Sequence, residues 1–170
     1  MRNRNVAFAL GMVIVAVLLQ SALFGQGRIQ PLLSSPNLTL VVVVATARYL
    51  VPEPALLIGF TAGLLMDLLG GSPLGLWALS LTVVAFLTLR VRDRADEGPV
   101  AVVVGVFALS VVGQTLFGVV GTLFGQRFFT DPGVLRLMLV PAVFNVGLAV
   151  AIVPLVSRVM RSRDPSRLVL

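Results

Sequence analysis

Asp67 is the only acidic residue of this chain that stands inside a long apolar stretch, so it is the first candidate for chemistry. Ionisable side chains are costly in a membrane interior and often mark sites for protons, ligands or partners. Histidine and cysteine are absent and all 13 basic residues are arginine, which excludes Cys/His zinc sites, a histidine base and lysine Schiff bases. A single carboxylate does not supply a paired acid and base. These absences disfavour an enzyme and any metal or cofactor site.

The neighbours of Asp67 favour a structural role. Gly59, Gly63 and Asp67 are spaced four residues apart, which places them on one face of a helix where another backbone could approach closely. Ser72 and Pro73 are the expected N-cap and N1 residues of the next helix, whose free N–H groups suit a carboxylate. We therefore expect Asp67 to tie two helices into a hairpin. Contact with a partner or ligand is the alternative. A proton relay is less favoured, because the other six acidic residues fall in expected loops or the tail.

Further polar and small residues interrupt the apolar pattern nearer the C-terminus. Gln114 and Asn145 lie at similar depth in two expected helices and could bond to each other as structural glue. Pro141, one turn before Asn145, frees a backbone carbonyl, so either a cavity or a simple bend is expected there. Gly121 and Gly125 repeat the small-residue spacing of packed membrane helices, a weakly specific motif.

The elements that must carry these residues are membrane helices. Hydrophobic residues make up 58% of the 170 and the mean hydropathy is +1.04, more than a soluble domain of this size can bury. We predict an all-α polytopic membrane protein with one transmembrane domain over residues 1–170. About six spans are expected, at residues 6–24, 38–50, 55–69, 74–89, 100–125 and 134–156. Pro52 and Pro54 are expected to end the second span, and the third, at about 22 Å, to be short of the ~30 Å core.

The arginines predict the orientation of these spans. With six spans, ten arginines fall on the side of both termini and three, Arg28, Arg127 and Arg136, on the other side. Cytoplasmic segments carry such an excess, so both termini are expected in the cytoplasm. The net charge of +6 is then mostly a topology signal, and nucleic-acid binding is not expected, although the tail could touch anionic lipid. The first span resembles a signal peptide in part, but its apolar length favours a retained helix.

The segment from Gly59 to Leu79, GFTAGLLMDLLGGSPLGLWAL, resembles the signature of the MreD family of bacterial rod-shape-determining membrane proteins. That pattern runs roughly G-F-x-x-G-L-x-x-D, a short turn, P-L-G and then A-L. The matching residues are Gly59, Phe60, Gly63, Leu64, Asp67, Pro73, Leu74, Gly75, Ala78 and Leu79. Residues 36–38 resemble the family's P-D-L with Asn37 in place of the usual aspartate, and Asn145 resembles an asparagine common in its last helix. The length and the basic tail also fit, so the resemblance covers the whole chain, while only 59–79 is specific.

The resemblance implies a non-enzymatic scaffold of the cell-wall elongation machinery in the bacterial plasma membrane. Its expected partners are MreC, a single-span protein with an extracytoplasmic domain, the actin-like MreB, and the RodA-type glycosyltransferase with its class B penicillin-binding protein. The family is also regarded as similar in fold to the S-components of vitamin transporters, which are six-helix bundles. We expect a partner helix to dock on the Gly59/Gly63 face or on the glycine-rich fifth and sixth spans.

A substrate-binding subunit of an uptake transporter, resembling an S-component, is the alternative function. Ala7 and Gly11 give a small-residue spacing that could dock on a transporter module, although such spacing is common by chance. The expected outer half offers few groups for a polar ligand beyond Gln20, which is expected at the membrane interface, and Asp67, Arg127 and Asp131. A membrane enzyme is the least favoured class.

Overall fold

Helices make up all the regular structure in the part of the chain that the computed structural model describes, residues 2–24, 35–92, 98–126 and 133–161. They are α1 (Arg2–Phe24), α2 (Leu38–Ala47), α3 (Pro52–Gly70), α4 (Leu76–Arg92), α5 (Pro99–Leu123) and α6 (Val134–Arg161). Each lies where a span was predicted, so the all-α prediction is confirmed. Four of them, α1, α3, α5 and α6, are long and apolar enough to cross a membrane, which indicates a membrane protein.

The helix α2 is shorter than predicted. It ends at Ala47 and is followed by a turn, so the expected span of residues 38–50 is wrong at its C-terminal end. Its 10 residues reach only about 15 Å, half of a ~30 Å hydrocarbon core. The predicted start is confirmed, because Asn37 is the N-cap and its side chain accepts a hydrogen bond from the Leu40 N–H at 2.9 Å. Residues 39–47 are all buried, so α2 is the centre of the bundle.

Four other helix starts differ from the predicted ones. The helix α1 begins at Arg2 instead of residue 6, and α5 begins at Pro99 instead of residue 100. The helices α4 and α6 continue past their predicted ends to Arg92 and Arg161, because charged residues can extend a helix beyond its apolar part, while α5 ends at Leu123, two residues before its predicted end.

The helix α3 begins at Pro52, three residues earlier than expected, because a proline in the first turn lacks only an N–H that has no helical partner. Its 19 residues reach about 28 Å, so the expectation of a short third span is wrong. The helix α4 begins at Leu76, which leaves Ser72 and Pro73 in the connection before it.

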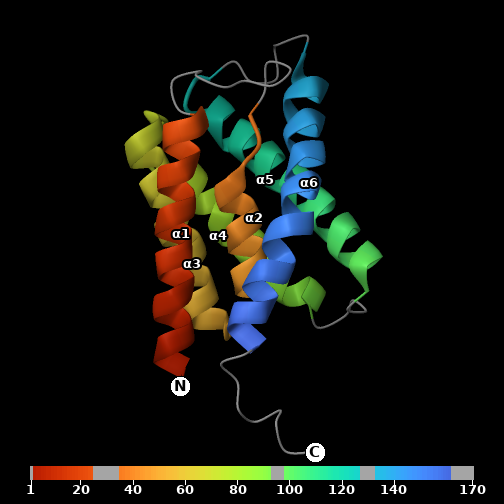
Figure 1. The fold of residues 1–170 in the computed structure, drawn as a ribbon. Coiled ribbons are helices and arrows are strands. Elements are labelled where there is room, and N and C mark those ends of the chain that lie inside the picture. The colour runs from red at the N-terminus through yellow and green to blue at the C-terminus, as the bar shows by residue number, and fades with distance from the viewer. Residues whose placement is uncertain (1, 25–34, 93–97, 127–132, 162–170) are drawn as a thin grey trace, which may run out of the picture.

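The helices surround α2, which contacts each of the other five. Figure 1 shows α2 between α1 and α6, with α3 and α4 further from the viewer. The start of α1 and the end of α6 lie at the same end of the bundle, as expected for an even number of passes. We call this the terminal end, and the opposite end, where α3 finishes, the distal end. Which end faces the cytoplasm stays a prediction from the arginines.

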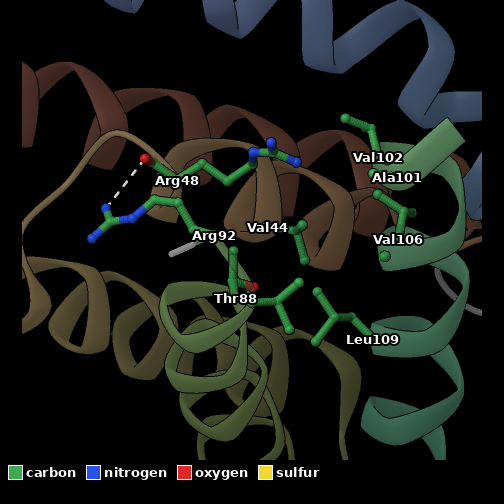
Figure 2. A pocket seen from close by; sticks show the side chains of 10 residues that line it. Val44, Arg48, Thr88, Arg92, Ala101, Val102, Val106 and Leu109 are labelled. Carbon is green, nitrogen blue, oxygen red and sulfur yellow. Dashed lines mark hydrogen bonds between the residues drawn. The ribbon is translucent and has the colours of Figure 1, made fainter. Parts of the chain in front are cut away.

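Arg92 of α4 fixes the terminal end of α2. Its guanidinium donates hydrogen bonds to the carbonyl oxygens of Leu50 at 2.8 Å and Arg48 at 3.2 Å, which lie where α2 has just ended. Figure 2 shows Arg92 reaching back to Arg48, whose own side chain runs towards Ala101 and Val102 of α5. The hollow beside these side chains measures about 20 Å³, enough for about one water molecule, so it is a packing gap and not a ligand site.

Candidate functional site

Asp67, at the distal end of α3, caps the start of α4 with four hydrogen bonds. One carboxylate oxygen accepts from the Ser72 hydroxyl at 2.7 Å and the Trp77 N–H at 3.1 Å. The other accepts from the N–H groups of Gly75 at 2.9 Å and Ala78 at 3.2 Å. Only 2% of the residue is exposed. Because helix N-termini leave their first N–H groups without helical partners, a buried acceptor here holds two helices together.

The turn that positions Asp67 depends on two glycines. Gly71, the C-cap residue that follows α3, has φ 72°, and Gly75 has φ 100°, conformations that residues with a Cβ rarely adopt. The Gly75 carbonyl accepts the first bond of α4, from the Leu79 N–H at 2.9 Å. The predicted capping by Ser72 with Pro73 at N1 is therefore wrong. Gly75 stands at the helix start, and the side chain that caps it comes from α3.

The face of α3 that carries Gly59 and Gly63 packs directly on α4. A Cβ on Gly59 would lie 2.7 Å from the Leu81 carbonyl oxygen, and one on Gly63 would collide with the backbone of Trp77 and Ala78. Both glycines are buried. The expected close approach is present, but the approaching backbone belongs to the same chain. The prediction that this face receives a partner helix is wrong, because α4 already covers it.

The outward side of the hairpin carries large apolar residues. Leu57, Phe60 and Leu68 of α3 share a helix face by their spacing and are 66%, 48% and 61% exposed. Leu74 in the turn and Leu79 on α4 are also exposed. The 59–79 segment thus contains residues that build the hairpin and others, such as Phe60, whose large exposed area faces outward. We call Leu57, Phe60 and Leu68 the α3 outer face.

Asn145 joins three elements in the centre of the bundle. Its side-chain oxygen accepts a hydrogen bond from the Asn37 N–H at 2.7 Å, and its amide nitrogen donates to the Ser110 hydroxyl at 3.0 Å. The residue is fully buried and so links α6 to α5 and to the start of α2. The predicted bond between Gln114 and Asn145 is wrong, because Asn145 uses Ser110, one turn earlier on α5. Gln114 is itself buried near the middle of α5.

Gln20 supports the same end of α2, a role that the sequence did not reveal. Its side-chain oxygen accepts from the Leu38 N–H at 2.7 Å, and its nitrogen donates to the Pro36 carbonyl at 2.9 Å. Its expected position at the membrane interface stays a prediction, because hydrogen bonds within the chain do not place the residue relative to a membrane. Only its amide type, which can donate and accept at once, could have pointed to this role. Asn37, Gln20 and Asn145 together satisfy N–H groups at a helix start that lies inside the bundle.

Gly121 and Gly125 end α5 and do not pack it on another helix. Gly125 has φ 82°, and the Gln126 N–H donates to the Gly121 carbonyl at 2.9 Å while the Gly125 N–H donates to that of Thr122 at 3.0 Å. This pair of bonds is the Schellman motif of helix C-termini. The packing role suggested by the four-residue spacing is wrong. Pro141 is buried within α6, which continues past it to Arg161.

A hollow of about 700 Å³ opens beside the hairpin turn at the distal end. Its lining comes from α1, the turn before α2, α3, α4 and α5. Trp77 and Phe117 stack there with ring centroids 4.4 Å apart, and Gln20, Ser21, Ser35 and Ser72 add polar atoms. The volume is in the range of small-molecule sites, and the described lining carries no charged side chain.

Several predicted features lie outside the described residues. They are Arg28, Arg94, Arg127, Asp131, Arg163 and Arg167, most of the charged loop of residues 90–97, and the basic tail. Among the residues that are described, no group of three or more acidic, histidine or cysteine side chains is placed to hold a metal ion.

Comparison with known proteins adds no relative. No family model, no curated protein and no solved structure matches the chain. The resemblance to the MreD family therefore remains a prediction from the residues of the 59–79 segment.

Proposed function

We propose that this chain is a non-enzymatic scaffold of the bacterial cell-wall elongation machinery, in the plasma membrane, as its resemblance to the MreD family implies. The observation that carries the proposal is the segment from Gly59 to Leu79. Its residue types match that family's pattern, and several have a specific task in the hairpin: Gly63 admits the α4 backbone, Asp67 caps α4, and Gly75 adopts a positive φ. The expected partners are an MreC-like single-span protein, the RodA-type glycosyltransferase with its class B penicillin-binding protein, and MreB.

The α3 outer face is the place we propose for the partner's membrane helix. The Gly59/Gly63 face is covered by α4, whereas Leu57, Phe60 and Leu68 point away from the bundle. Phe60 belongs to the family pattern, yet nearly half of its surface is exposed, so packing within the chain does not explain it. Helices in lipid associate through van der Waals packing and side-chain fit, which an aromatic and two leucines at helical spacing can supply.

Pairwise co-purification tests this proposal. The tagged chain is expressed with the MreC-like protein of the same genome, and recovery of the pair is measured after size exclusion in mild detergent. Alanine at the three residues of the α3 outer face is expected to lower recovery of the partner while the chain itself stays folded. The matched control places alanine at three equally exposed residues of α6: Leu135, Val143 and Val150. Loss of the partner in both triple variants, or in neither, contradicts the proposed docking face.

The alternative is a ligand-binding subunit of an uptake transporter, and the distal hollow favours it. A space of about 700 Å³ lined by Trp77, Phe117 and serine hydroxyls suits a small uncharged ligand with an aromatic part. Native mass spectrometry of the protein purified from its own membrane separates the two functions. A small molecule bound at one copy per chain, and lost when Ser21 and Ser35 are replaced by leucine, would favour the transporter subunit.

A further inference from the structure

An apolar groove runs along the bundle between α1 and α6. Both helices pack on α2, and Figure 1 shows α2 lying between them. The groove measures about 500 Å³ and has walls from α1 and α6, with Leu38 and Val42 of α2 on its floor. Its lining is almost wholly hydrocarbon, and it contains no acidic residue.

Small residues on the α1 wall leave open space in the groove. Ala7, Gly11 and Val15 follow each other at four-residue spacing along the groove. A Cβ added to Gly11 would meet nothing within 4 Å, so the space beside this glycine is open. From Ala7 to Leu19 the groove follows α1 for about 18 Å.

The size of the groove decides between two kinds of occupant. A helix with its side chains is about 10 Å wide and would fill roughly 1,400 Å³ over that length, almost three times the groove. A single extended hydrocarbon chain is far thinner. The groove can therefore enclose the tail of a lipid, whereas a transmembrane helix could enter it with one face only.

Basic side chains mark the terminal end of the groove. Arg4 precedes Phe8 of the α1 wall by one turn, lies on the same helix face and is exposed. Arg158 follows Leu155 of the α6 wall by three residues and is exposed as well. Since α1 starts and α6 finishes at the terminal end, Arg4 and Arg158 both belong to helix segments at that end of the bundle. Arginine binds phosphate oxygens in a bidentate manner, so the head group expected here is an anionic phosphate ester.

We propose that this groove binds an anionic phospholipid, with one acyl chain along α1 and α6 and the head group at Arg4 and Arg158. The apolar walls hold the acyl chain by van der Waals contact alone, because a tail that leaves other lipid tails gains no hydrophobic free energy. The arginines supply the preference for negative charge, at about 1 kcal/mol each near a membrane surface, which corresponds to about a five-fold preference per arginine.

The test uses native mass spectrometry of the full-length protein in mild detergent, with equal amounts of phosphatidylglycerol and phosphatidylcholine of the same chain length. The wild-type protein is expected to retain phosphatidylglycerol about 25-fold better, a factor of about five for each of the two arginines. Arg4→Gln should reduce that preference about five-fold. Gly11→Leu, which fills the groove, should reduce retention of both lipids. The control is Gly147→Leu, an equally open glycine of α6 that does not line the groove.

Three outcomes would overturn the proposal. The first is equal retention of the two lipids by the wild-type protein. The second is unchanged retention in Gly11→Leu, provided that this variant elutes as the wild type does in size exclusion. The third is a protein partner that is lost from the purified complex in Gly11→Leu while bound lipid stays the same, which would assign the groove to a helix.

Discussion

The effect of Asp67 on folding stability can be predicted in most detail, because all four donors that its carboxylate accepts from are known. Replacing Asp67 with leucine removes all four bonds and leaves three backbone N–H groups at the start of α4 without their acceptor. A hydrogen bond to a charged group contributes about 1.5–3 kcal/mol. These bonds share one side chain and are not additive, and the half-buried Gly75 and Trp77 retain some access to water, so we expect a total loss of about 3–5 kcal/mol.

Asp67→Asn tests how much stability remains when an uncharged amide keeps part of the hydrogen bonds of the carboxylate. With its oxygen towards Gly75 and Ala78, the amide keeps two of the backbone bonds, and the Ser72 hydroxyl can turn to accept from the new NH2 group. Only the Trp77 N–H then loses its acceptor, so we expect a loss of about 1–2 kcal/mol.

The assay is the apparent melting temperature in one detergent, measured by the monodisperse fraction that remains after heating. At roughly 2–4 °C per kcal/mol, Asp67→Leu should melt about 10 °C below the wild type and Asp67→Asn about 3–5 °C below it. Thr61→Leu is the matched control, since the Thr61 hydroxyl bonds only to the Leu57 carbonyl of its own helix. Equal melting of Asp67→Leu and the wild type would refute the capping account, and so would an asparagine variant as unstable as the leucine one.

Three further predictions test other contacts by the same melting assay. Gly63→Ala should prevent the hairpin from closing and lower the melting temperature by at least 10 °C, because its Cβ would collide with the α4 backbone, whereas Gly70→Ala has open space and should melt like the wild type. In a double-mutant cycle, Asn145→Leu and Ser110→Ala should show a coupling energy of about 0.5–1 kcal/mol, and a coupling of zero would contradict the bond between them. Thr39→Val should leave stability unchanged or raise it, since the Thr39 hydroxyl is buried without a hydrogen-bond partner; a clear loss of stability would show that the hydroxyl has a partner.

The positions of the helices could be predicted because a helix that crosses the hydrocarbon core needs a run of about 20 apolar residues. Apolar runs bounded by arginines, prolines and glycines located all six helices. The exact ends could not be predicted where another part of the chain sets them. Ala47 ends α2 close to the carbonyls that Arg92 binds, and Arg92 lies more than 40 residues further along the chain.

For the candidate site, the residues that pack and cap could be predicted from the sequence, but their partners could not. The spacing of Gly59, Gly63 and Asp67 predicts that a backbone can approach one face of α3, and the nearby turn predicts a capped helix. The spacing does not show whose backbone approaches, and it turned out to be α4. Asn145 and Asn37 are 108 residues apart, so their bond depends on which helices are neighbours, and periodicity carries no information on that.

The function itself is tested most directly by purifying the tagged chain from its native membrane in mild detergent and identifying the co-purifying proteins by mass spectrometry. The proposed scaffold predicts an MreC-like single-span protein together with wall synthases, and loss of the MreC-like protein when Leu57, Phe60 and Leu68 are changed to alanine. ATPase subunits and a transmembrane coupling protein in their place would contradict it and assign the chain to an uptake transporter.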